Sequence, residues 1–255
     1  MSDRIAIYTV AMGGEYALPL IGARDDASFY CFTDREIEES NGWTVLRRDA
    51  LLAGDTYRSS RDYKIRPHLH LRDHSRSIYI DTSVQILESP EAIWEQLMPS
   101  ASTAFGGIFH SYRESVADEF RAVKRSALDY RETLEEQERA YLTYYPSALT
   151  ERPIWGGFMA RRHMVPACQA AMETWFANVL RYSRRDQLSL PLALAQLPDE
   201  LKNILALDIR SSPIHEWPRH GLPRPAGYKI GKEAGWLERG LRACLRRVAS
   251  HPRRR

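Results

Sequence analysis

Cysteine is scarce in this sequence. The 255 residues contain three, Cys31, Cys168 and Cys244, which lie far apart and form no Cys-x-x-Cys pair. This spacing excludes the usual cysteine-based zinc sites. So few cysteines are typical of a reducing compartment, and a chain of this length can bury most of its apolar surface without disulfides. Cys31 lies in an apolar run, so we expect it in the core.

Long hydrophobic runs and several common motifs are also missing. No apolar run approaches the roughly 20 residues that a membrane span needs. The first ten residues, MSDRIAIYTV, lack the basic and apolar regions of a signal peptide, so we expect a cytoplasmic protein. The sequence has no Gly-x-Gly-x-x-Gly, Walker or Gly-x-Ser-x-Gly motif. Their absence argues against dinucleotide-binding, P-loop and α/β-hydrolase enzymes.

Positive charge is concentrated at the end of the chain. The net charge is +3, but residues 236–255 contain seven arginines and one glutamate, so they carry +6 and leave −3 for the rest. A predicted helix over 236–248 places Leu237, Leu241 and Leu245 on one face. This basic amphipathic helix either binds an anionic membrane, as in a protein on the inner membrane face, or packs on the main domain. We divide the chain into domains 1–235 and 236–255, and the acidic body argues against a nucleic-acid partner.

Predicted strands and helices alternate along the first half of the chain. Apolar runs predict strands over 5–10, 27–32, 43–46 and 77–87, the last of which we expect to end at Asp81, and residues 155–159 predict a turn into a fifth strand. Helices are predicted over 60–71, with a kink at Pro67, and over 89–97, 113–141, 166–180 and 183–197. Residues 211–230, rich in proline, glycine and histidine, predict a long loop. This order favours an α/β fold with a mostly parallel sheet covered by helices.

Polar or flexible residues follow three of these strands. Gly13-Gly14 follows the first, Asp34 the second and Asp81 the fourth. Ligands of such sheets bind beyond the carboxyl ends of the strands. We therefore expect these residues to cluster at one edge, with Asp34 and Asp81 binding substrate.

Four segments carry a resemblance to a known family. They are CFTD at 31–34, SRDYKIRPH at 60–68, SIYID at 77–81 and RDQLS at 185–189. In order and spacing they resemble the TOD1-type hexosyltransferase-like domains of plants and bacteria, over roughly residues 3–200. That family is similar to the glycogenin-type glycosyltransferases of the GT-A fold. The resemblance implies a Rossmann-like sheet that binds a nucleoside-diphosphate sugar, usually with Mn or Mg.

The resemblance implies a metal-binding role for Asp81. An Asp-x-Asp motif at this strand end would hold the ribose and, through a hard cation, the diphosphate. Here Ser83 replaces the second aspartate, and a hydroxyl is a poorer ligand, so dependence on a metal stays open. His215 and His220 are the further candidate metal ligands, and Lys229 or Lys232 the candidate phosphate ligand. Alternatively, Asp81 only caps a turn.

Other candidate residues come from the remaining segments. Arg61 and Lys64 share a helix face, where they would either neutralise the diphosphate or form surface salt bridges. Asp186 and Gln187 would contact the donor sugar, with Asp186 as the base if the enzyme inverts. Alternatively, Asp186 completes a capping box with Ser183.

A glycine pair follows an aromatic residue in the fifth predicted strand. Gly156 and Gly157 would let the donor sugar and the acceptor approach the backbone. Trp155 either stacks on a sugar or packs in the core.

The most concrete functional hypothesis is a hexosyltransferase. It would move a hexose from a nucleoside-diphosphate sugar, with UDP favoured, to a glycan or lipid-linked acceptor, and the glycogenin likeness favours retention. Two alternatives stay open. One is a non-catalytic GT-A-like module that binds a nucleotide or a glycan, and the other is a membrane- or nucleic-acid-binding protein led by its basic tail.

Overall fold

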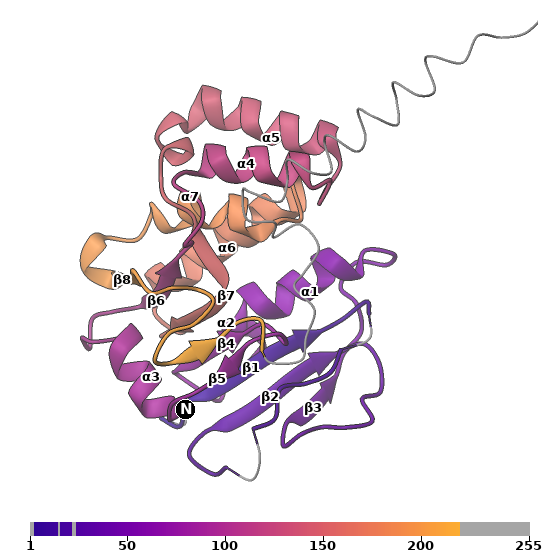
Figure 1. Ribbon diagram of the computed structural model, residues 1–255, viewed down its shortest axis with the longest axis vertical. Coiled ribbons are helices and arrows are strands. Elements are labelled where there is room, and N and C mark those ends of the chain that lie inside the picture. The colour runs from indigo at the N-terminus through magenta and orange to yellow at the C-terminus, as the bar shows by residue number, and fades with distance from the viewer. Residues whose placement is uncertain (1–2, 15, 22–23, 220–255) are drawn as a thin grey trace, which may run out of the picture. The chain divides into compact units, whose positions relative to one another are not determined.

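A seven-stranded mixed sheet forms the centre of the computed structural model, which describes residues 3–14, 16–21 and 24–219 (Figure 1). Its strand order is β3-β2-β1-β4-β7-β6-β8. The strands are β1 Ala6–Ala11, β2 Ser28–Thr33, β3 Thr44–Arg47, β4 Ser77–Ile80, β6 Phe105–Phe109, β7 Ile154–Arg161 and β8 Lys202–Leu205. Every neighbouring pair is parallel except the two that β7 forms with β4 and β6. The predicted mostly parallel α/β sheet is therefore confirmed.

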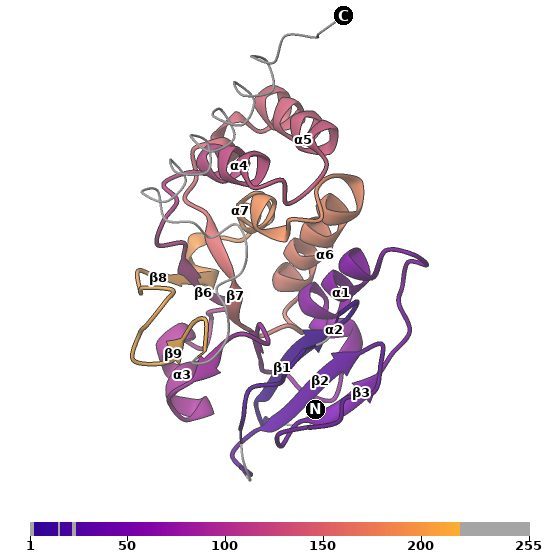
Figure 2. The same cartoon turned by 45° about the vertical axis from the view of Figure 1, so that its right-hand side comes forward.

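Helices cover the sheet and extend from it. They are α1 Thr56–Ile65, α2 Pro67–His70, α3 Pro90–Leu97, α4 Val116–Arg125, α5 Arg131–Tyr144, α6 Pro166–Arg181 and α7 Leu190–Leu194. Figure 2 shows α1 beside α6, and side chains of both join the main core with Tyr8 and Met159 of the sheet. Next to Met159 on β7, Phe158 packs on His215 instead. Because neighbouring strand residues point to opposite faces, the ribbon of β5 (Gln85–Ile86) and β9 (His215–Glu216) covers the other face.

The predicted long helix over 113–141 is wrong, because the structure has two helices there. Between α4 and α5 the chain turns at Ala127, which has a positive φ of 48°. The two helices pack on each other through Phe120, Leu134 and Tyr141, and they share this small core with Leu188. The apolar periodicity is right in both halves, but periodicity alone does not detect a turn made of ordinary residues.

The predicted helix over 183–197 and its capping box are also wrong. The segment forms a 3-10 turn at Asp186–Leu188 and the short α7. Ser183 Oγ donates to Asp129 Oδ2 at 2.6 Å, and it does not cap a helix at Asp186. The alternative interpretation of Asp186 as a capping residue is thereby excluded.

The predicted helix over 60–71 is shifted toward the N-terminus and divided. Asp55 is the N-cap of α1, since its side chain accepts a bond from the Arg58 N–H at 2.8 Å. Pro67 starts the separate helix α2 after a break at Arg66, as its missing N–H requires. The shift does not change the face that carries Arg61 and Lys64.

The predictions made for residues 220–255 concern a segment outside the described residues. The helix over 236–248, its membrane contact and the roles of His220, Lys229 and Lys232 therefore stay predictions. Among the helices of the described residues, none is long and apolar enough to cross a membrane.

Candidate functional site

The topology predicts a binding crevice between β1 and β4. From β1 the chain moves outward in one direction to β2 and β3, whereas β4 lies on the opposite side of β1. In open α/β sheets a ligand binds beyond the carboxyl ends of the strands at such a reversal. Gly13-Gly14 follows β1 and Asp81 follows β4, so both lie at this crevice, as the sequence predicts.

Four residues singled out from the sequence meet in one charge cluster at this edge. Lys64 Nζ lies 2.5 Å from Asp186 Oδ2 and 3.9 Å from Asp81 Oδ1. Arg61 Nε lies 3.3 Å from Asp186 Oδ2. The Lys64 and Asp186 side chains are only 3% and 6% exposed. We refer to Arg61, Lys64, Asp81 and Asp186 as the charge cluster, and its two cations and two carboxylates balance.

Burial and pairing together set the protonation of Asp186. Burial alone would raise the pKa of its carboxyl, but the neighbouring charges of Arg61 and Lys64 outweigh it and hold the pKa well below its usual range. Trp175 Nε1 donates to the Asp186 main-chain oxygen at 2.8 Å and fixes the backbone. Asp186 is therefore a rigidly held, ionised carboxylate at neutral pH.

Gln187 lies beside this carboxylate with an unused donor. Its side chain is 4% exposed. Its amide nitrogen has no hydrogen-bond partner among the described residues. Because a buried polar group without a partner is unfavourable, the amide is ready to bond a ligand.

The glycine pair of β7 has two different environments. A Cβ atom on Gly156 would lie 3.1 Å from Lys64 Nζ and 3.6 Å from Asp186 Oδ2. A Cβ atom on Gly157 would come within 2.5 Å of the Trp155 ring. The missing side chain of Gly156 therefore makes room for the ion pair itself, whereas that of Gly157 serves packing.

Trp155 is a core residue in this structure. It is 2% exposed, and its ring lies 5.1 Å from His215 and 5.6 Å from Trp217, measured between centroids. A sugar could reach the ring only by displacing these neighbours. The core-packing interpretation of Trp155 is thus the one that the geometry supports.

Asp34 joins the loops that follow β1 and β2. Its carboxylate accepts a hydrogen bond from the Gly13 N–H at 3.1 Å and lies 3.5 Å from Arg35 Nε. Asp34 therefore lies at the predicted edge, on the side of the crevice away from the charge cluster.

The described residues do not fit the divalent metal that the GT-A fold implies. Asp81 Oδ1 accepts the Tyr79 hydroxyl at 2.6 Å, and Ser83 Oγ accepts the Trp217 indole N–H at 3.0 Å. His215 is buried, with Nδ1 2.7 Å from Ser212 Oγ and Nε2 3.1 Å from the Ile209 carbonyl oxygen. The described part of the chain holds no group of three or more His, Cys, Asp or Glu side chains arranged for a metal.

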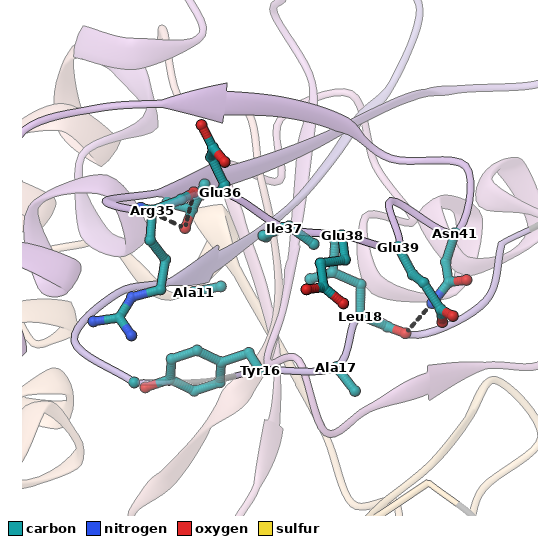
Figure 3. A pocket seen from close by; sticks show the side chains of 12 residues that line it. Ala11, Tyr16, Ala17, Leu18, Arg35, Glu36, Ile37, Glu38, Glu39 and Asn41 are labelled. Atoms are coloured by element: carbon teal, nitrogen blue, oxygen red, sulfur yellow. Dashed lines mark hydrogen bonds between the residues drawn. The ribbon is translucent and has the colours of Figure 1, made fainter.

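A cavity of about 480 Å³ opens beside the crevice, between the loops that follow β1 and β2 (Figure 3). Tyr16 and Leu18 line one side, and the segment Arg35–Glu39 lines the other. Burial raises the pKa of Tyr16, so its phenol stays protonated and donates to the Met12 carbonyl oxygen at 3.0 Å. Sequence reasoning missed this pocket, and the only signal for it was the Gly-Gly turn after the first strand.

The α/β chain contains a glycosyltransferase-like domain. The family described as "TOD1/MUCI70, glycosyltransferase-like domain" matches residues 33–210, and the chain belongs to this family. Among solved structures, apo mouse xyloside xylosyltransferase 1 is similar, with a TM-score of 0.46 and 14% identity over 80% of this chain and 85% of that one. No curated protein matches the sequence.

Proposed function

We propose that this protein transfers a hexose from a nucleoside-diphosphate sugar, with UDP as the expected nucleotide, to a hydroxyl of a glycan or lipid-linked acceptor. The observation that carries the proposal is the charge cluster at the topological reversal of the sheet, with Lys64 and Asp186 buried, next to the unpartnered amide of Gln187. Fixed charges that are shielded from water interact strongly with a polar ligand and can orient it.

The pocket of Figure 3 suits the nucleoside part of the donor. Its apolar side chains, Leu18 and Ile37, offer contacts to a base, and its carboxylates, Glu36, Glu38 and Glu39, can accept hydrogen bonds from ribose hydroxyls. The same carboxylates would repel phosphate groups. The diphosphate would therefore leave the pocket toward the crevice, where the charge cluster would receive the sugar.

Asp186 is assigned the orientation of a donor-sugar hydroxyl. An effective general base needs a pKa near the working pH, whereas the pKa of this carboxyl is held far below it by Arg61 and Lys64 against the effect of burial. Asp186 would be a weak base, which favours a retaining over an inverting reaction. Gln187 would donate its free amide N–H to the same sugar.

A non-catalytic binding module is the second candidate. It is favoured by Ser83, which stands where a second carboxylate would be expected and is bonded to Trp217. The two candidates make opposite predictions for turnover, since only an enzyme would hydrolyse or transfer the donor sugar.

The test begins with thermal shift against UDP, GDP, CDP and their sugars, each with Mn and with EDTA. A ligand at 100 times its dissociation constant should stabilise the protein by about 2.7 kcal/mol. We expect a shift with one nucleotide and slow release of free sugar from its UDP-hexose, lost in Asp186→Asn. Binding without any sugar release would favour the module. No shift with any nucleotide, from folded protein, would count against the transferase and leave only a module that binds a glycan.

The lipid-linked acceptor rests on the basic sequence of residues 236–255. Flotation with vesicles containing phosphatidylserine should depend on this segment and weaken with salt. If a chain ending at residue 235 floats as well as the full chain, the lipid-linked part of the proposal is wrong.

A further inference from the structure

The side chain of Arg219 bridges the two sides of the crevice. Its Nε donates to the Thr82 carbonyl oxygen at 3.3 Å, directly after Asp81, and its Nη2 donates to the Ala17 carbonyl oxygen at 2.8 Å in the loop after β1. Its backbone N–H donates to the Ser83 carbonyl oxygen at 2.7 Å. The guanidinium thus lies between the nucleoside pocket, which Ala17 lines, and the charge cluster.

This guanidinium carries a charge that the described residues do not balance. Its hydrogen bonds go to carbonyl oxygens, and within the described residues no carboxylate forms an ion pair with it. Partial burial lowers the pKa of Arg219, with no acid to offset it. An arginine stays charged nonetheless, and its planar fork matches the oxygens of a phosphate.

The four residues of the charge cluster carry no net positive charge for a diphosphate. Lys64 and Arg61 are matched by Asp186 and Asp81. Lys64 is also 3% exposed and lies 3.9 Å from Asp81, so a divalent cation on Asp81 would stand next to a fixed ammonium group. The Asp81 side chain is 38% exposed, so water weakens this repulsion, but a second cation this close to Lys64 is still unfavourable.

The segment that supplies Arg219 also covers the place of the missing carboxylate. Trp217, two residues earlier, donates its indole N–H to Ser83 Oγ at 3.0 Å. The hydroxyl and the carbonyl oxygen of Ser83 therefore both bind the segment 217–219 where an Asp-x-Asp motif would present a metal ligand. Ser83, which replaces the aspartate, thus also helps to position Arg219.

We infer that this chain binds the donor diphosphate without a divalent metal, and that the Arg219 guanidinium supplies the cation in its place. The inference rests on the proposed function, because it assumes a nucleoside-diphosphate donor. It assigns Arg219 a substrate-binding role that no sequence motif indicated.

Isothermal titration of the full chain with UDP and with uridine tests this inference, each in EDTA and in Mn. We expect the Kd of UDP to agree within about twofold between the two buffers. Arg219→Met should weaken UDP binding at least about tenfold and leave uridine binding unchanged. Arg210→Met is the matched control, since Arg210 precedes the segment 217–219 and packs on Tyr112 at 5.2 Å, and the variant should bind UDP normally.

The uridine titration separates phosphate binding from a structural role. If Arg219→Met weakens UDP and uridine equally, Arg219 only holds the loops, and the inference is overturned. UDP binding that requires Mn and is lost in Asp81→Asn or His220→Ala would also overturn it, while leaving the proposed function intact. Failure of folded wild-type protein to bind UDP, GDP or CDP under either condition would count against the proposed function itself.

Discussion

The charged side chains of the charge cluster and those of the pocket beside it differ in their exposure to solvent. Lys64 and Asp186 are almost completely buried and only 2.5 Å apart, whereas Glu36 on the pocket rim is 91% exposed. Electrostatic interactions strengthen as the local dielectric falls. Under the proposed function, the cluster would orient the reacting sugar, while the rim, which water screens, would contribute shape and hydrogen bonds. The fold would then separate recognition of the donor from its chemistry.

The largest effect should come from breaking the buried pair. In Asp186→Asn, Lys64 loses its close partner and keeps only Asp81 at 3.9 Å. Removal of one partner of a buried ion pair costs about 3–5 kcal/mol, and we expect the lower end. Urea unfolding would measure it, with Glu36→Gln as the exposed control. If the free energy of unfolding falls by less than about 1 kcal/mol, water reaches Lys64 and Asp186 and the pair is not effectively buried.

Two glycine substitutions should separate the regions by kinetics. The methyl group of Gly156→Ala would lie 3.1 Å from Lys64 Nζ and shift the ammonium group by a few tenths of an ångström, so we expect kcat to fall by less than about 100-fold. The methyl group of Gly14→Ala would lie 3.3 Å from the Tyr16 ring, so it should raise KM for the donor. Steady-state kinetics would show kcat falling in the first variant only. Equal effects on kcat would contradict the separation.

A third test compares how pH changes the protonation of a buried core histidine and of the charge cluster. Burial lowers the pKa of His163 to about 4 from an ordinary value of 6.5. Because the unfolded chain binds this proton more readily, stability should fall as pH drops from about 6.5 to about 4, at most about 1.4 kcal/mol per pKa unit. Asp186 stays ionised across this range.

His163→Gln is the variant for this test. It should flatten the dependence of unfolding free energy on pH, measured in urea at pH 7 and pH 4.5, whatever its stability at pH 7. An unchanged slope would assign the acid sensitivity to other groups.

The smallest effect should come from the pocket rim. Glu38→Gln removes a charge from a surface that water screens, so we expect KM for the donor to change less than about threefold. The change should shrink further in 0.5 M salt, where the Debye length is only a few ångströms. A tenfold change in KM would mean that Glu38 contacts the donor directly.

Some parts of the fold follow from local sequence pattern. The strands β1, β2 and β4 are apolar runs with turn signals behind them, and they lie where predicted. β6 was missed because Gly106-Gly107 lowers strand propensity. The structure explains Gly106, since a Cβ atom there would come within 2.3 Å of the Leu97 carbonyl oxygen of α3. Gly106 disfavours a strand by its local propensity, but it allows α3 to pack closely on β6.

The candidate site divides in the same way. Arg61, Lys64, Asp81 and Asp186 were proposed from motifs in separate segments, and the structure brings them together. Arg219 was missed because its neighbours are the main-chain carbonyl oxygens of Thr82 and Ala17. Main-chain groups are the same in every residue and leave no trace in a motif.

The sequence by itself determined the class of fold, the family and the residues of the charge cluster, because strand patterns and motifs depend on residues that are close together in the chain. Only the tertiary structure decided how those charges pair and that Arg219 forms no ion pair with a carboxylate of the described residues. It also decided what Ser83 and Trp155 contact. These properties depend on distances between segments far apart in the chain and on the exclusion of water from between them. Both arise only when the sheet and its helices pack.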